Sequence, residues 1–78
     1  MKFMNYIKKR DSVYQRYFTS KSYLEEIENT LDEAEQAYHS LHTPKRLNSF
    51  KNASLLYEVA IREYNHARRE LHSFLEIA

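Results

Sequence analysis

One spacing in the sequence is typical of a metal-binding helical bundle. Glu63 and His66 form an E-x-x-H pair, and residues three apart lie on the same face of a helix. Di-iron four-helix proteins use two such pairs with two further glutamates, so a dimer would have to supply the second pair. Tetrapeptides of this kind are common, and two solvated polar residues beside Tyr64 are the better interpretation. Metal binding is therefore our third hypothesis, and we predict no metal ligands and no cofactor.

The other histidine pair and the rest of the sequence give no sign of catalysis. His39 and His42 follow Glu35 at the predicted end of a helix, where histidine interacts favourably with the helix dipole. The sequence has no glycine-rich phosphate loop, no G-x-S-x-G motif and no cysteine nucleophile. A catalytic cleft is also difficult to build from two or three short helices. We therefore predict no catalytic residues and no enzymatic activity.

Basic and aromatic side chains alternate along the first 21 residues. Six Lys and Arg stand there against Asp11, which gives this segment a net charge of +5. Such a surface could neutralise phosphates and stack bases, or lie on an anionic membrane. The helical period of the aromatic residues instead indicates that they form a core and that the basic residues are solvated. Nucleic-acid binding through this segment is therefore the alternative function and not the first choice.

The charges of the chain are segregated although its net charge is only +1. Residues 22–43 hold six acids and no Lys or Arg, whereas residues 44–78 carry a net +2. An acidic segment of this kind can meet the basic segment of another subunit, which predicts an antiparallel, charge-matched dimer. The predicted partner-contact residues come from both segments: Lys8, Lys9, Arg10, Arg16, Glu25 and Glu28.

The elements that carry these residues are predicted to be helices. Glycine is absent and Pro44 is the only proline, so the tight turns of a small sheet protein have no suitable residues. Apolar residues from Leu24 to Leu41 recur at alternating steps of three and four, which is a heptad pattern. Thr43 and Pro44 are typical of a helix N-cap and first turn.

We predict an all-α fold, a long antiparallel helical hairpin that forms a single domain over residues 1–78. The first arm covers about residues 2–42, the turn residues 42–44 and the second arm about residues 44–77. Ser22 and Glu25 fit a capping box, which would break the first arm near Ser20 and give a three-helix bundle. Because the heptad phase continues across this junction, we favour the hairpin, with some bending near Ser20.

The second arm has an apolar face wider than a two-helix seam can cover. Such a face needs a third helix or a second subunit, so we predict self-association into a helical bundle, with a dimer as the expected state. The predicted self-association face consists of Leu47, Phe50, Leu56, Ala60, Tyr64 and Leu71.

These observations favour a small adaptor or regulator that presents a helical surface to a protein partner of unknown identity. No apolar run approaches the roughly 20 residues that span a bilayer. Residues 1–10 hold scattered charges and no apolar core of a secretory signal. We therefore expect a protein of the cytoplasm.

Overall fold

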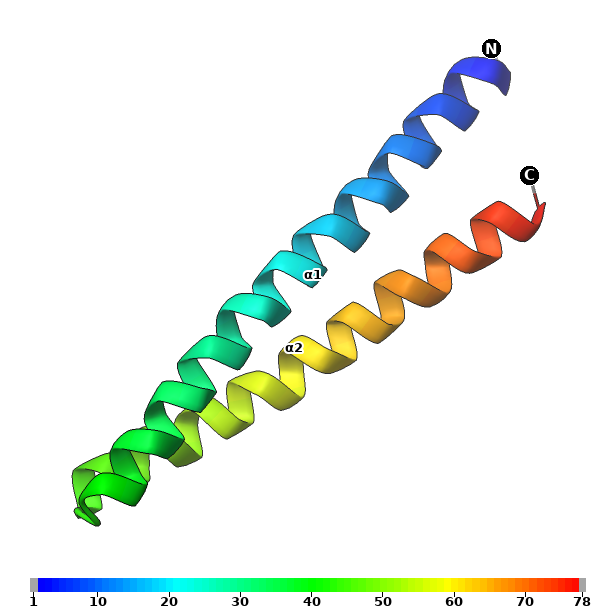
Figure 1. The fold of residues 1–78 in the computed structure, drawn as a ribbon. Coiled ribbons are helices and arrows are strands. Elements are labelled where there is room, and N and C mark those ends of the chain that lie inside the picture. Colours follow the sequence, from blue (N-terminus) through cyan, green and yellow to red (C-terminus); the bar gives the residue numbers. More distant parts are fainter. Residues whose placement is uncertain (1, 78) are drawn as a thin grey trace.

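The computed structural model describes residues 2–77, which form two antiparallel helices (Figure 1). Helix α1 is Lys2–Ser40 and helix α2 is Pro44–Ile77. The predicted all-α hairpin is confirmed, since 96% of the described residues are helical and the two helices pack against each other. The hairpin measures 59 × 16 × 13 Å, with a radius of gyration of 17.5 Å. A compact domain of this length would have a radius of gyration of about 12 Å, so the molecule is strongly elongated.

Helix α1 continues without interruption past Ser20 and Ser22, where the capping-box pattern would break it. The three-helix alternative is therefore wrong, and so is the capping-box interpretation, because Ser22 lies inside the helix. The Ser20 hydroxyl instead donates a hydrogen bond to the Tyr17 carbonyl oxygen, 3.0 Å away, within the same helix. Without glycine or proline in this stretch, nothing forces the backbone out of the helical conformation.

The turn is closed by side chains from both of its ends. Helix α1 ends at Ser40, two residues before the predicted His42. The predicted cap is confirmed, since the Arg46 backbone N–H donates to Thr43 Oγ1 at 3.2 Å. Arg46 Nη1 also donates to the carbonyl oxygen of Ala37, 2.7 Å away. This charge-assisted hydrogen bond satisfies a terminal carbonyl of α1 without a glycine cap.

The seam between the helices alternates small and large side chains. Ala53, Ala60 and Ala67 recur every seven residues along α2 and are 3%, 0% and 6% exposed. Val13, Leu24 and Ile27 are the buried residues of α1. Alanine methyl groups allow the two backbones to approach, because the distance between packed helices depends on the side chains at the contact.

Aromatic pairs cross the seam at three levels of the hairpin. The rings of Tyr38 and Phe50 lie 6.0 Å apart near the turn, and those of Tyr17 and Tyr64 lie 5.7 Å apart near the middle. Tyr6 and Phe74 stack at 5.3 Å near the terminal end. These separations suit favourable aromatic packing. Together with the alanine row, they hold two long helices side by side with a very thin core.

The consequence of this thin core is a large exposed surface. The hairpin exposes 6255 Å². A compact protein of 9.5 kDa would expose about 5000 Å². Among residues 3–76, nine large hydrophobic side chains are at least 42% exposed: Phe3, Met4, Tyr6, Phe18, Leu41, Leu55, Leu56, Val59 and Leu75. Neither helix, over the residues described, has a stretch that is long and apolar enough to cross a bilayer.

Candidate interaction surface

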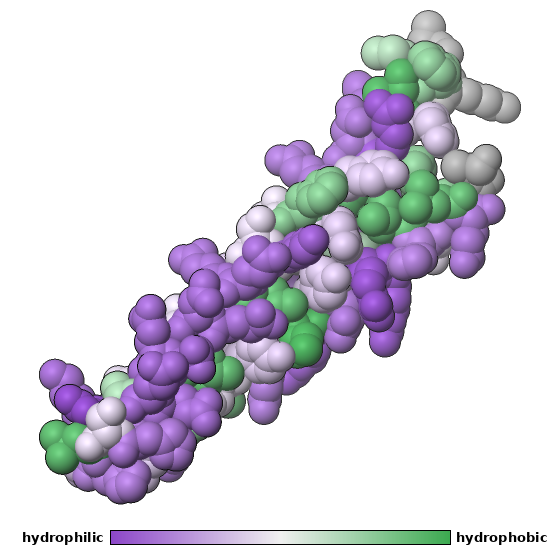
Figure 2. All heavy atoms as spheres, viewed as in Figure 1, coloured by the Kyte–Doolittle hydropathy of each residue, from purple (hydrophilic) through white to green (hydrophobic). Residues whose placement is uncertain are grey.

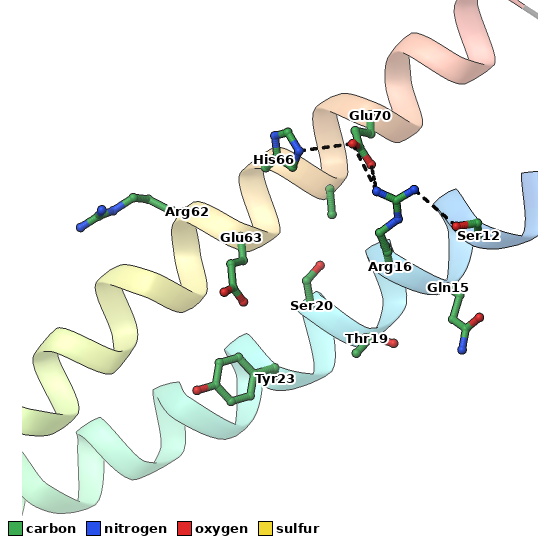
Figure 3. Close-up of a pocket in the computed structure, with 11 residues that line it drawn as sticks. Ser12, Gln15, Arg16, Thr19, Ser20, Tyr23, Arg62, Glu63, His66 and Glu70 are labelled. Carbon is green, nitrogen blue, oxygen red and sulfur yellow. Dashed lines mark hydrogen bonds and ion pairs between the residues drawn. The ribbon is translucent and has the colours of Figure 1, made fainter. Parts of the chain in front are cut away.

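A groove of about 810 Å³ runs between the two helices on one side of the hairpin (Figure 3). Helix α1 contributes Arg16 and Tyr23 to its walls, and α2 contributes Glu63, His66 and Glu70. We call this side of the hairpin the groove face. Its polar side chains belong to the half of the hairpin nearer the termini.

An ion pair joins the two helices across this groove. Arg16 Nη1 lies 3.0 Å from Glu70 Oε2, and Arg16 Nη2 donates to Ser12 Oγ at 3.3 Å. His66 Nε2 lies 3.2 Å from the other carboxylate oxygen of Glu70 (Figure 3). The Arg16 side chain is 56% exposed, so solvent screens the pair and we expect it to contribute about 0–1 kcal/mol. The groove therefore contains a surface network and not a sequestered reactive group.

The E-x-x-H pair lies on the groove face without forming a metal cluster. Glu63 and His66 both line the groove, but the imidazole of His66 is directed to Glu70 (Figure 3). Between residues 3 and 76, no three His, Asp or Glu side chains are grouped as metal ligands. In the second histidine pair, His39 and His42, the ring of His42 packs against a neighbouring aromatic side chain, with its centroid 4.6 Å from that of Tyr38. Within the described residues of one chain, the Glu63–His66 pair is therefore present but is not part of a group of metal ligands.

The predicted partner-contact residues all lie on α1, in two separate groups. Lys8, Lys9 and Arg10 are exposed in its first half, and Glu25 and Glu28 are exposed in its second half. Since they belong to the same helix, the basic and acidic groups do not meet within one chain. The sixth predicted residue, Arg16, is already paired with Glu70, as described above. Arg10 Nη2 also lies 3.3 Å from Asp11 Oδ1 of the same helix. Lys8, Lys9, Glu25 and Glu28 are exposed to solvent and can contact another molecule.

The residues of the predicted self-association face are divided among different environments. Ala60 is fully buried against Leu24 and Ile27 of the same chain, so it is inaccessible to a partner of the hairpin. Phe50 and Tyr64 are half-buried in the aromatic pairs of the seam. The two leucines, Leu47 and Leu71, are half-buried as well. The register of the two helices places these side chains at or beside the intrachain seam.

Leu56 is the one member of that predicted face that is clearly exposed, at 45%. Leu55 and Val59 accompany it, at 61% and 46% exposure, and sequence reasoning missed both. Leu56 and Val59 stand seven residues before Glu63 and His66, so they extend the groove face towards the turn. The signal was present in the spacing, because apolar residues outside the alternating three-and-four steps fall outside a two-helix seam.

Tyr64 shows how closely the helices meet beside the groove. A hydrogen bond with the Tyr17 side chain raises the pKa of Tyr64 above its ordinary value of 10.0, and burial adds to this effect. The nearby positive charges of Arg68 and Lys21 act in the opposite direction. The neutral form of Tyr64 is therefore the one that this packing favours.

Comparisons with family models, with curated proteins and with solved structures find no match to this chain. Its function has to be argued from its own residues. Three features carry that argument: an elongated hairpin with a thin core, a cluster of exposed aliphatic side chains, and two oppositely charged halves of α1.

Proposed function

We propose that this chain is a non-enzymatic interaction module that binds another protein through its helical surface. The observation that carries the proposal is the exposed surface of 6255 Å², which exceeds that of a compact protein of this mass by about 1200 Å². A standard protein–protein interface buries about 1200–2000 Å² in total. The hairpin thus has the spare surface that a binding partner would cover.

The aliphatic cluster on α2 is the proposed centre of that interface. Leu55, Leu56 and Val59 lie within about one helical turn of one another and are each at least 45% exposed. Burying one such side chain completely is worth about 1.5–3 kcal/mol. The surrounding charges would form the polar rim that protein interfaces usually have.

The polar groups of the groove support binding more than catalysis. Arg16, His66 and Glu70 interact with one another at the surface, and no buried side-chain nitrogen or oxygen among the described residues lacks a hydrogen-bond partner. General acid–base catalysts are usually sequestered groups with shifted pKa values. We therefore infer an adaptor or regulator, and we propose the cytoplasm as its location.

A comparison of bound proteins would test this proposal. Native protein and the Leu56→Asp variant are immobilised and exposed to extracts of the native host, with Leu75→Asp as the control. Leu75 is similarly exposed, at 50%, but belongs to a different row of α2. We expect quantitative mass spectrometry to find proteins that the native chain and the control retain and Leu56→Asp loses. Identical sets on all three proteins would contradict the proposal.

Nucleic-acid binding is the second candidate, and one observation favours it. Lys8, Lys9 and Arg10 follow one another and are all exposed, beside the exposed ring of Tyr6. We expect fluorescence anisotropy to detect no binding to mixed-sequence DNA or RNA tighter than the micromolar range at physiological salt. Submicromolar, salt-sensitive binding that is lost when all three residues become Gln would promote this candidate.

A further inference from the structure

The two ends of the hairpin carry opposite charge. In the half nearer the termini, residues 2–21 have a net charge of +5, and residues 59–77 hold three Arg against three Glu. In the half nearer the turn, residues 22–58 hold seven acids against three Lys and Arg, a net −4. The hairpin is 59 Å long, whereas charges in physiological salt are screened beyond about 8 Å. The ends of one molecule therefore do not neutralise each other, but a neighbour in the opposite orientation would neutralise both.

The groove face has its apolar centre at the middle of the molecule. Tyr23 lies two residues from the midpoint of α1, and Val59 lies within two residues of the midpoint of α2. With a twofold axis at this level, position n of α2 lies opposite position 121 − n of the second copy, so Val59 lies opposite position 62 and the two aliphatic clusters adjoin across the axis. Over the face drawn in Figure 2, in contrast, hydrophobic side chains gather towards the termini. If an antiparallel copy packed on the face drawn in Figure 2, the hydrophobic side chains near the termini would lie against the acidic half of that copy.

We propose that the partner of the groove face is a second copy of this chain, packed face to face and antiparallel to form a four-helix bundle. This inference rests on the proposed function and specifies its partner. A twofold axis across the middle of α1 brings position n opposite position 42 − n of the second copy. Lys9 then lies opposite Glu33, and the axis creates this pairing twice.

The position of these charges supports the groove face as the contact. Lys9 lines a second hollow on this face, together with Arg16, His66 and Glu70. Glu26 borders Tyr23, and Glu33 stands seven residues further along the same helix face. Basic and acidic residues thus lie on the same side of α1, on either side of its midpoint. A parallel copy would instead bring the like-charged ends together.

The dimensions of the hairpin suit a stable dimer. A face 59 Å long and 16 Å wide corresponds to about 900 Å² for each copy. Two copies would then bury about 1800 Å² in total, within the range of specific interfaces. The contact would cover Leu56 and Val59 on both copies and would double the depth of the core.

The first experiment measures mass by light scattering coupled to gel filtration across a micromolar dilution series. We expect a native mass of about twice 9.5 kDa, because two copies associate. Leu56→Asp should give the mass of one chain with unchanged helicity, since an unpaired carboxylate would be buried in the interface. Leu75→Asp should remain dimeric. A native protein that stays at the mass of one chain, or dissociation by the control variant alone, overturns the inference.

The second experiment measures orientation by fluorescence energy transfer. The chain has no cysteine, so Met4→Cys and Leu41→Cys, both at exposed positions, each provide one labelling site. We expect strong transfer between Met4→Cys on one copy and Leu41→Cys on the other, and weak transfer between two Leu41→Cys copies. Two labels at the turns would lie nearly the 59 Å length of the hairpin apart. The opposite pattern would show a parallel dimer and overturn the inference.

The third experiment tests the charge pairing through exchanged charges. Lys9→Glu and Glu33→Lys should each weaken self-association by about tenfold, because each substitution changes two pairs in the dimer. A mixture of the two variants should form heterodimers that approach native affinity. No recovery in the mixture overturns the pairing. If the chain stays monomeric while Leu56→Asp still loses a protein from host extracts, this inference fails and the proposed function stands.

Discussion

At the turn, α1 and α2 are joined by contacts between residues close in sequence. Thr43 caps α2, the Arg46 guanidinium binds the Ala37 carbonyl oxygen at 2.7 Å, and Tyr38 packs against Phe50. At the terminal end, the contacts join residues more than 50 positions apart, as in the Arg16–Glu70 pair. Closing a long loop costs more chain entropy than closing a short one.

This contrast indicates that the hairpin is most secure at the turn and weakest at the termini. Stacking of Tyr6 on Phe74 closes the terminal end, yet the Tyr6 side chain is 42% exposed. The terminal half also carries the positive charge and several of the exposed hydrophobic side chains, among them Phe3 and Phe18. The terminal half thus presents more exposed hydrophobic side chains to a partner, although Val13 and Ala67 are buried within it.

The largest expected effect comes from breaking a helix within the turn half. Leu31→Pro removes a backbone hydrogen bond inside α1 and should cost about 3 kcal/mol or more. Met4→Pro, in the first turn of α1, should cost much less, because the first four N–H groups have no partner within the helix. Urea unfolding followed by circular dichroism measures both. Tolerance of Pro at Leu31 would mean that the turn half is not the stable part.

A smaller effect is expected from truncating a core side chain. Ile27 is 7% exposed and packs in the cluster with Ala60, so Ile27→Ala should lower the free energy of unfolding by about 2–5 kcal/mol. Leu75, near the terminal end, is 50% exposed, and Leu75→Ala should cost less than about 1 kcal/mol. Equal losses in the two variants would refute the difference in packing between the two regions.

The N-cap offers a matched pair of substitutions with an effect of intermediate size. Thr43→Ala should cost about 0.5–2 kcal/mol through loss of the cap. Ser22→Ala should be neutral within about 0.5 kcal/mol, because Ser22 occupies a helix interior where alanine is favourable. Thermal unfolding of both variants provides the measurement. A larger loss at Ser22 would indicate a break in α1 that the structure does not contain.

The fold was predictable wherever a local signal determined it. The heptad pattern from Leu24 to Leu41 and the Thr43–Pro44 start signal each rest on neighbouring residues, and the structure has both features. The break near Ser22 was not predictable, because a serine and a glutamate three residues apart suit both a cap and a helix interior. Whether Ser22 caps a helix or lies inside one depends on how α2 packs along α1, which is not a local property of the sequence.

The surface was harder to predict than the fold. The spacing places Ala60 on the predicted self-association face, yet the register between the helices buries it completely. The spacing predicts one wide apolar face on α2 and does not single out Leu55 and Val59, whereas α1 covers only the central rows of that face. The contact of Arg46 with Ala37 also depends on the path of the turn, for which the sequence has no local signal.

The smallest expected effect concerns the ion pair of the terminal half. Arg16→Gln should lower the free energy of unfolding by at most about 1 kcal/mol, because the pair is exposed and screened. High salt should remove the difference from the native protein. Denaturant titrations of the native protein and of Arg16→Gln at two salt concentrations measure this difference in the free energy of unfolding. A loss well above this limit that high salt removes would mean that the ion pair, more than the aromatic pairs, holds the terminal half together.

The central proposal is that the groove face binds a second copy of this chain and that its burial completes the core. The most direct test is the urea midpoint of unfolding as a function of protein concentration, because association that favours the folded state raises stability by mass action. The account predicts a midpoint that rises with concentration for the native chain and stays constant for Leu56→Asp. A midpoint independent of concentration for the native chain as well would contradict it.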